Sequence, residues 1–586
     1  MNKLRRTLLA AGLVLCATPA LADAGALDAT PRAANVPAQL SGSERDNYRA
    51  VFADLRAENW AGAAGRLDGM RPGPLHDLAR AMYYTMPGSP RVEREPLLAL
   101  LARAPELAQA SDLARLARLR GAEDVPGLPP VQRLAGLPGQ PRRARARAVR
   151  GDPVADALEP LVQPLLVADR PFEAESLLNE RRDELSPEAR TAFQQRIAWV
   201  YYLNGNDREA RRIAEDGRRG VTEWALHSEW VAGLAAWRMG DHEAAADHFG
   251  TVAARSGDVE LAAAGHYWAA RADTAGGRPQ LVQGRLRAAA RMNETFYGLL
   301  AQSALAMRQR PADLDAFSAE DWRTLSSLPN VRAAVALAEI GESAIAGDLL
   351  RHQARIGNPR DHEALLHLAG RLNLTGAQMW LAHNGPRGFR TETHDRYPSP
   401  DWRPARGWRV DPALAFAHAL QESNFRPDAV SPAGARGLMQ VRPGTASDIV
   451  RWGRANADPN RLTDPVTNIE FGQAYLEYLR DLPATGGLLP RVIASYNAGP
   501  APIGEWNARY DLSDPLLYIE SIPYWETRGY VPIVLRNYWI YEQASAERSV
   551  SRRALVAGLW PRFPGMAGAT AVRIEPRRAQ TAMGRD

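Results

Sequence analysis

The sequence predicts a mainly α-helical protein: an array of paired helices, then a helical linker and a C-terminal domain. From about residue 40 to 390 the chain is rich in Ala, Leu, Arg and Glu and lacks sustained alternation of apolar and polar residues. Short Gly, Asn or Asp turns interrupt this region, a pattern typical of successive helices. Four short motifs follow residue 410. Because 586 residues exceed one ordinary hydrophobic core, we expect several domains.

The N-terminus has the composition of a secretory signal. Cationic residues precede an apolar run over residues 8–17, and Ala20-Leu21-Ala22 supplies the small residues of a cleavage site. The run is shorter than a membrane helix, and no later stretch approaches the roughly 20 apolar residues that such a helix needs. We therefore expect removal of residues 1–22 and an exported mature chain without an integral membrane segment.

Cysteine and lysine usage narrow the possible chemistry. Cys16, the only cysteine, lies in the predicted signal, so the mature chain has no thiol for a disulfide, a nucleophile or a metal site. Lys3 is the only lysine. The formal net charge of +5 becomes smaller when the signal is removed, because the signal contains cationic residues and no acidic ones. The densest basic run, over residues 142–150, is predicted to be a solvated segment. Nucleic acid is not expected as a partner.

Three turns that are followed by similar residues predict a helical repeat. They occupy residues 168–174, 204–210 and 240–244, and the alanines that align in them are 36 and 34 residues apart. A period of about 34 residues is that of tetratricopeptide-like helix pairs, which stack into a superhelical solenoid. The best copy contains Trp230, Gly233, Trp237, Ala244 and Phe249. A bundle of unrelated helices that share common turn residues is the alternative.

Turn-rich sequence marks the start of the last domain. Aromatic clusters at residues 266–271 and 295–300 are predicted to be core packing within helices, and helical stretches continue to about Leu381. Residues 384–404 then contain four prolines, which predicts a boundary there. The predicted division is a signal peptide (1–22), an α-superhelical domain (23–310), a helical linker domain (311–395) and a C-terminal domain (396–586).

The first motif of the C-terminal domain contains a glutamate at the end of a helix. Asp411 and Pro412 are favourable at a helix start, and the residues before Pro427 must end the helix. Glu422 is therefore expected near the helix C-terminus, where the dipole disfavours an anion. Partial burial beside Phe425 would add to this effect and raise the pKa of Glu422. A carboxyl that stays protonated near neutral pH is what a general acid needs.

Three further motifs accompany Glu422. They cover residues 431–446, 493–500 and 518–531. With Glu422-Ser423, and in this order, they resemble the catalytic domain of the soluble lytic murein transglycosylases, a lysozyme-like family that cleaves peptidoglycan without water. The resemblance is close over residues 396–545 and weaker over 40–390, where segments such as 268–271 look like those of the family's superhelix. It implies a ring-shaped superhelix that carries a lysozyme-like α domain.

The resemblance also implies roles for the matching residues. Glu422 is the sole catalytic acid and base, and Tyr496 directs its hydroxyl toward it. Met439 and Gln440 line the groove beside the sugar that is cleaved. The implied substrate-binding residues are Ser423, Gly437, Leu438, Met439, Gln440, Tyr496, Asn497, Glu520 and Glu526.

The last motif leaves one alternative open. The family has an acidic residue there that contacts the site, for which Glu526 is favoured and Glu520 is not excluded. Two positions depart from the family pattern: Ser495 stands where alanine is usual, and Arg442 replaces a residue that is commonly apolar. Groove contacts near these two residues are therefore less well defined than the acid.

The implied reaction cleaves the β-1,4 bond between N-acetylmuramic acid and N-acetylglucosamine and leaves a 1,6-anhydromuramic end. Most glycosidases use two carboxylates, whereas this domain has one clearly placed carboxyl, Glu422. The substrate's own N-acetyl group would stabilise the positive sugar carbon. A hydrolytic muramidase of the same fold and a non-catalytic peptidoglycan-binding scaffold are the alternatives.

The resemblance implies a periplasmic location and peptidoglycan glycan strands as the partner, and it leaves other cell-wall enzymes open as partners. The sequence has no His/Asp/Glu cluster with the spacing of a metal site and no nucleotide-binding glycine loop. Neither a metal nor a cofactor is therefore predicted.

Overall fold

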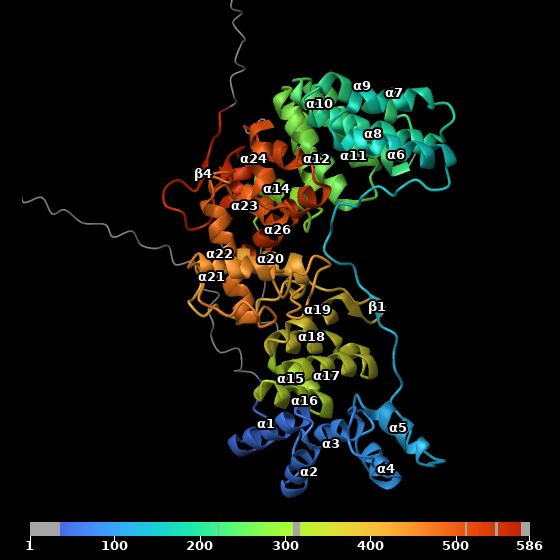
Figure 1. The fold of residues 1–586 in the computed structure, drawn as a ribbon, viewed down its shortest axis with the longest axis vertical. Helices are drawn as coiled ribbons and strands as arrows, with labels where there is room; N and C mark the ends of the chain where they lie inside the picture. Colours follow the sequence, from blue (N-terminus) through green and yellow to red (C-terminus); the bar gives the residue numbers. More distant parts are fainter. Residues whose placement is uncertain (1–35, 221, 309–316, 510–512, 545–548, 576–586) are drawn as a thin grey trace, which may run out of the picture.

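The computed structural model describes residues 36–220, 222–308, 317–509, 513–544 and 549–575. Helices form nearly all of the regular structure in these ranges (Figure 1). The predicted signal peptide lies outside the described residues. Within the described ranges, no helix combines the length and the apolar character needed to cross a membrane.

The N-terminal helices and the linker helices share one hydrophobic core at one end of the molecule (Figure 1). Phe52 and Leu101 contribute from the first segment, and Leu337 and Leu365 from the second. The first segment comprises α1 (Gly42–Arg56), α2 (Trp60–Gly69), α3 (His76–Thr85), α4 (Arg94–Arg103) and α5 (Ala110–Leu119). The second comprises α15 (Ala319–Leu325), α16 (Pro329–Glu339), α17 (Ser343–Ile356), η2 (Pro359–Asp361), α18 (His362–Arg371), α19 (Thr375–His383) and η3 (His394–Arg396).

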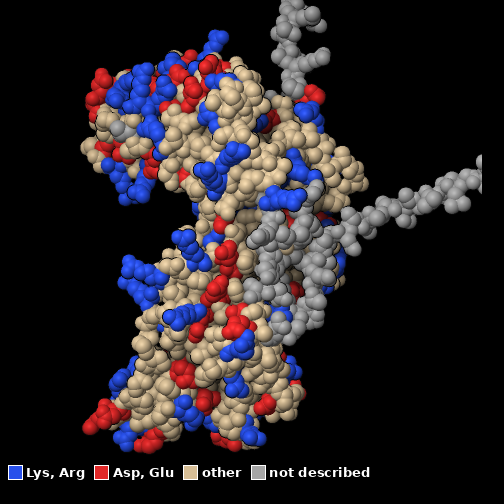
Figure 2. All heavy atoms as spheres, turned by 180° about the vertical axis from the view of Figure 1, so that it is seen from behind, with Lys and Arg blue, Asp and Glu red and all other residues tan. Residues whose placement is uncertain are grey.

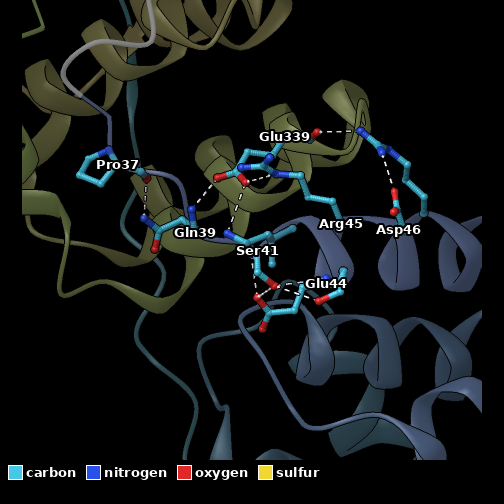
Figure 3. A network of polar contacts seen from close by, with 10 residues as sticks. Pro37, Gln39, Ser41, Glu44, Arg45, Asp46 and Glu339 are labelled. Atoms are coloured by element: carbon cyan, nitrogen blue, oxygen red, sulfur yellow. Dashed lines mark hydrogen bonds and ion pairs between the residues drawn. The ribbon is translucent and has the colours of Figure 1, made fainter.

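Glu339 at the end of α16 anchors the segment that leads into α1 (Figure 3). Its carboxylate accepts the backbone N–H of Gln39 at 2.6 Å and the side-chain N–H of Arg45 at 3.0 Å. Ser41 and Glu44 form a capping box that starts α1, because each side chain accepts the backbone N–H of the other. The beginning of the described chain is thus fixed to a helix about 300 residues later.

An extended segment, residues 120–151, connects α5 to the other end of the molecule (Figure 1). Within it, β1 (Ala135–Gly136) pairs antiparallel with β2 (Asn384–Gly385), and Ala135 lies opposite Gly385. The pairing of β1 with β2 thus joins this segment to the residues that follow α19, between the two ends of the molecule. On the face seen in Figure 2, a notch separates the two ends, and acidic and basic side chains are interspersed over both.

The predicted helix pairs stack at the other end of the molecule (Figure 1). They are α6 (Pro153–Val167), α7 (Pro171–Glu180), α8 (Pro187–Leu203), α9 (Asp207–Gly217), α10 (Thr222–Arg238), α11 (His242–Arg255), α12 (Val259–Ala275), α13 (Pro279–Ala290) and α14 (Phe296–Ala304). In the best-predicted pair, a Cβ on Gly233 would lie 2.7 Å from the Phe249 ring, so glycine allows the close approach of α10 and α11. The predicted solenoid is confirmed.

The predicted turns share one backbone geometry. Asp169, Gly205 and Gly240 have φ of 58°, 79° and 77°, and in each case the next residue's N–H bonds to the carbonyl five residues before it. This is the Schellman arrangement, which ends a helix at a left-handed residue. Gly277 and Gly341 repeat it after α12 and α16, at two positions that the sequence analysis missed.

The C-terminal helices share the core of the helix pairs, which runs from Ala155 to Phe563. They are α20 (Pro412–Ser423), α21 (Pro443–Arg451), α22 (Pro465–Asp481), α23 (Leu489–Ala498), α24 (Pro500–Arg509), α25 (Pro515–Glu520), α26 (Trp525–Ala544) and α27 (Val550–Val556). A short hairpin of β3 (Trp560–Pro561) and β4 (Ala571–Val572) follows.

Hydrophobic packing crosses the predicted domain boundaries. The predicted domain 23–310 contributes to both cores, because α1–α5 pack on the linker and α6–α14 pack on the C-terminal helices. The physical reason is that an extended segment, not a helix, follows α5, so α1–α5 bury their apolar faces on α15–α19. The boundaries at 310 and 395 stay a prediction.

Candidate active site

The helix α20 ends at the predicted catalytic glutamate. Asp411 caps its N-terminus by accepting the Ala413 N–H at 2.9 Å, and Pro412 occupies the first helical position. Asn424 adopts a left-handed conformation, with φ of 50°, and ends the helix. Glu422 is therefore the penultimate residue of α20.

The Glu422 carboxyl is partly buried, and its pKa is raised toward neutral pH. Burial is the main cause that raises its pKa from 4.5 to about 7, and the charge of Glu526 raises this pKa further. Tyr530 acts in the opposite direction, because its hydroxyl donates to Oε1 of Glu422 at 2.6 Å and favours the carboxylate. A pKa near the working pH suits a group that must both give and take a proton.

His418 supports Tyr530 from within the core. Its Nδ1 lies 2.9 Å from the Tyr530 hydroxyl, and burial of the imidazole lowers the pKa of His418 to about 3, so the ring is neutral. While Tyr530 donates to Glu422, the Nδ1–H of His418 is the donor to the Tyr530 oxygen. His418 was not predicted from the sequence, although its position four residues before Glu422 puts both on one face of α20.

The second motif is fixed against the end of α20. The Ser423 hydroxyl donates to the Leu438 carbonyl at 2.7 Å. Gly437 has φ of 76°, and a Cβ there would lie 2.1 Å from the Leu462 carbonyl oxygen, so only glycine fits. Leu438 is fully buried. Within this motif, the predicted residues Ser423, Gly437 and Leu438 hold the loop in shape.

Asn468 of α22 clamps the same loop, and the sequence analysis missed it. Its side chain accepts the Met439 N–H at 2.7 Å and donates to the carbonyls of Arg436 and Leu462. The Met439 side chain is fully buried, and a Cβ on Gly472 would lie 2.1 Å from its sulfur. The prediction that this side chain lines a groove is wrong, because it fills the space above Gly472.

Tyr496 lies beside the catalytic group but does not point at it. Its hydroxyl donates to the Met439 carbonyl at 2.8 Å, and its ring packs on His418 with the centroids 4.5 Å apart. The hydroxyl that was predicted to face Glu422 from Tyr496 comes instead from Tyr530. Both tyrosines lie in the quoted motifs, and sequence order alone does not reveal which one reaches the carboxyl.

Gln440 adopts φ of 48° and closes the loop of the second motif. Its side-chain N–H groups donate to the carbonyls of Gly437 and Ala429 at 2.8 and 3.1 Å. The side chain stays partly exposed beside α20. Its contact with a substrate stays a prediction.

Asn497 connects the third motif to the start of α26. Its Oδ1 accepts the Thr527 hydroxyl at 2.6 Å, and its Nδ2 donates to Glu526 at 3.3 Å. Glu526 is exposed, and its charge acts on the pKa of Glu422. Of the two acidic residues that the sequence left open, Glu526 is the one beside the Glu422 carboxyl.

Glu520 lies in the contact between the helix pairs and the C-terminal domain. It is 1% exposed and accepts from Arg143 at 2.8 and 3.0 Å and from the Tyr297 hydroxyl at 2.7 Å. Both carboxylate oxygens are occupied, which argues against contact with substrate. Arg143 belongs to the run that was predicted to be solvated. That prediction is wrong for Arg143, because its partner lies 377 residues later and no local pattern reveals it.

A cleft of about 580 Å³ borders the start of α26, between the helix pairs and the C-terminal domain. Aromatic rings offer faces on which sugars stack, and arginine binds carboxylates through two parallel hydrogen bonds. The aromatic faces of the cleft therefore suit a sugar polymer, whereas Arg196 and Arg509 already pair with Glu159 and Asp169. Its aromatic and arginine side chains are Trp199, Trp224, Trp506, Tyr524, Trp525, Arg145, Arg196, Arg509 and Arg528.

Residues 403–517, which include Glu422 and Tyr496, match a family model described as the transglycosylase SLT domain. We refer to these residues as the SLT domain. This match confirms the resemblance to the soluble lytic murein transglycosylases. The SLT domain accounts for the first three motifs, whereas the whole of the fourth, residues 518–531, follows the matched residues.

Two curated relatives match over about a fifth of this chain. The chain is 40% identical over 133 residues to the soluble lytic murein transglycosylase of Escherichia coli (strain K12), a match that covers 22% of this chain and 20% of that protein. It is 39% identical over 137 residues to the soluble lytic murein transglycosylase of Salmonella typhimurium, covering 23% and 21%. The matches thus span about a fifth of the length of these relatives.

Over most of the chain the likeness to solved structures is one of fold. The X-ray structure of an inactive mutant of the lytic transglycosylase Slt from Pseudomonas aeruginosa has a TM-score of 0.50 and 21% identity, over 86% of this chain and 82% of that chain. At this identity the match concerns the fold alone. It agrees with the predicted fold class, a helical superhelix with a lysozyme-like domain.

Proposed function

We propose that this chain is a peptidoglycan lytic transglycosylase that cleaves the β-1,4 bond between N-acetylmuramic acid and N-acetylglucosamine and leaves 1,6-anhydromuramic ends. The observation that carries the proposal is the state of Glu422, a partly buried carboxyl with a pKa of about 7 that is held by Tyr530 within an SLT domain. The 40% identity of this chain, over 133 residues, to a soluble lytic murein transglycosylase supports the same reaction.

In the first step Glu422 acts as the general acid. With a pKa of about 7, a substantial fraction of Glu422 carries a proton at neutral pH. Transfer of this proton to the glycosidic oxygen releases the N-acetylglucosamine side, and the N-acetyl oxygen of the substrate stabilises the positive C1. Tyr530 gains importance as the carboxylate forms, because its hydrogen bond favours the charged state.

In the second step Glu422 acts as the base. The carboxylate removes the proton from the 6-hydroxyl of the muramic sugar, and the oxygen closes onto C1. The proton lost in the first step is thereby restored, and no water is consumed. One carboxyl therefore suffices, provided that the site keeps water away from C1.

A second carboxylate favours one alternative. Glu526 lies close enough to raise the pKa of Glu422, and a hydrolytic muramidase of the same fold would use two carboxylates. The products distinguish the two reactions, since the anhydro product is lighter by one water than a reducing muramic end. A non-catalytic scaffold would release neither product.

The proposed substrate is the peptidoglycan glycan strand, and the proposed location is the periplasm after removal of residues 1–22. Gln440, Asn497 and Glu526 are exposed or partly exposed polar groups of the motifs around the acid, and we assign substrate contacts to them. The aromatic and arginine-lined cleft would hold a more distant part of the strand or its peptide.

Digestion of purified sacculi, with mass analysis of the soluble fragments, tests this function. The wild type is expected to release anhydromuropeptides, and Glu422→Gln is expected to release none while it still binds sacculi. Glu526→Gln is the matched control: it should yield the same anhydro products at a reduced rate. Reducing ends in the wild-type digest, or full activity of Glu422→Gln, would refute the proposal.

A further inference from the structure

A second cluster of ionisable side chains lies where the linker meets the segment that leads into the SLT domain. His367 comes from α18, and His394 and Asp395 come from η3. One ligand atom from each residue lies within 4.8 Å of the other two. We propose that these three side chains bind a divalent transition-metal ion of the zinc class.

The distances in the cluster are those of metal ligands. The Nε2 atoms of His394 and His367 lie 3.4 and 3.7 Å from Oδ1 of Asp395. These separations exceed the usual N–H···O range of about 2.7–3.2 Å. Ligands about 2.05 Å from a zinc ion in a tetrahedron are about 3.3–3.4 Å apart. The two nitrogen–oxygen separations are therefore close to those between neighbouring ligands of such a tetrahedron, and the third separation lies within 4.8 Å.

One of these atoms lacks any other function. The Nε2 of His394 is buried, and no hydrogen-bond partner for it exists among the residues that the structure describes. A buried ring nitrogen without a partner is uncommon in a native protein. A metal ion between His394, His367 and Asp395 would satisfy it.

The charge around the cluster also favours a cation. The Asp395 side chain is 7% exposed, and one of its oxygens accepts the Glu392 N–H at 3.2 Å, while Oδ1 is the oxygen nearest the imidazoles. Glu363, one turn before His367 on α18, lies close enough for its charge to act on Asp395. Two imidazoles and a carboxylate suit zinc, cobalt, nickel or copper, and three protein ligands leave a fourth position for water.

The position of the cluster indicates a structural role. His367 lies on a helix of the core that contains α15–α19, whereas Tyr397, two residues after Asp395, belongs to the core shared by the helix pairs and the C-terminal helices. Thr393 and Arg396 flank the cluster, and both donate to Glu294 between α13 and α14. The ion would fasten the chain where it passes from one core to the other. The sequence shows no metal motif because the ligands come from two separate elements.

Metal titration of the untagged full chain, stripped with a chelator, tests the proposal. Isothermal titration with Zn²⁺ is expected to detect one site per chain, and Co²⁺ is expected to give the visible absorption of a tetrahedral site. His367→Ala and Asp395→Asn should weaken Zn²⁺ binding by about 100-fold or more, because loss of an outer-shell partner alone typically costs about 10–100-fold. His266→Gln, a half-buried histidine of α12, should bind as the wild type does.

Two results would overturn the proposal: a wild-type chain that binds no Zn²⁺, or ligand variants that bind it with unchanged stoichiometry and affinity. Circular dichroism of the metal-free proteins verifies that each variant is folded. Digestion of sacculi is a separate readout, so failure of the metal site and failure of the proposed enzymatic function are distinguishable.

Discussion

Replacing Tyr530 by phenylalanine tests the chemistry of Glu422 most directly. The change removes the 2.6 Å hydrogen bond to Oε1 and leaves the ring in place. Because this bond favours the carboxylate, its loss raises the pKa of Glu422 above its value of about 7. Hydrogen bonds to charged groups contribute about 1.5–3 kcal/mol. Since Glu422 is partly exposed, we take the lower end of this range, which corresponds to about one pKa unit.

The expected result has two parts. The general acid must be protonated, so kcat/KM falls as pH rises through the pKa of Glu422, and in Tyr530→Phe this fall should occur about one pH unit higher. The plateau should also drop about tenfold, because the carboxylate formed in the first step loses its donor. Initial rates of muropeptide release from sacculi, measured between about pH 5 and 9, give both values.

Tyr496→Phe is the matched control, because its hydroxyl donates to the Met439 carbonyl rather than to Glu422. This variant should keep the wild-type pH profile. If the alkaline limb of Tyr530→Phe does not move, or moves to lower pH, the assignment of Tyr530 as the donor to the catalytic carboxyl is refuted.

Three stability predictions follow from the same contacts. The pKa of Glu422 is raised in the folded state, so its ionisation costs stability as pH rises from about 4.5 to 7. Measured by denaturant unfolding, Glu422→Gln should therefore have a free energy of unfolding about 1–3 kcal/mol above that of the wild type at pH 8 and equal to it at pH 4. An equal gain at both pH values contradicts this. Glu520→Gln leaves Arg143 buried without its ion-pair partner and should lower the free energy of unfolding by about 3–5 kcal/mol, whereas the exposed Glu526→Gln should change it by less than about 0.5 kcal/mol. The buried Ser495 hydroxyl has no hydrogen-bond partner among the described residues, so Ser495→Ala should raise the midpoint of thermal unfolding, by an amount equivalent to about 1 kcal/mol, and a lower midpoint counts against this.

The helix pairs could be predicted from the sequence where the turns between the helices contain recognisable residues. Gly205 and Gly240 end helices in the Schellman geometry, and the alanines after them revealed the repeat. Gly277 and Gly341 adopt the same geometry, but different residues follow them, so these two turns could not be recognised from the sequence pattern. How α1–α5 pack could not be predicted, because Glu339 lies about 300 residues from the backbone that it anchors.

The site was predictable in its acid and less so in its surroundings. Glu422 follows from a helix start at Asp411 and a forced end before Pro427, which are local signals. Tyr530 lies 108 residues from its acceptor, so its pairing depends on how α26 crosses α20. The same limit hid the pairing of Arg143 with Glu520, since a run of arginines resembles a solvated segment until its acidic partner is known.

The shared core of α1–α5 and α15–α19 has a consequence for the order of folding. The helices α1–α5 are synthesised first and have no neighbouring solenoid helices on which to pack. Their apolar faces stay uncovered until the segment that contains Leu337 and Leu365 is present. A fragment that stops at residue 308 would thus expose those faces and tend to aggregate, whereas co-expression of residues 317–389 should rescue it in trans.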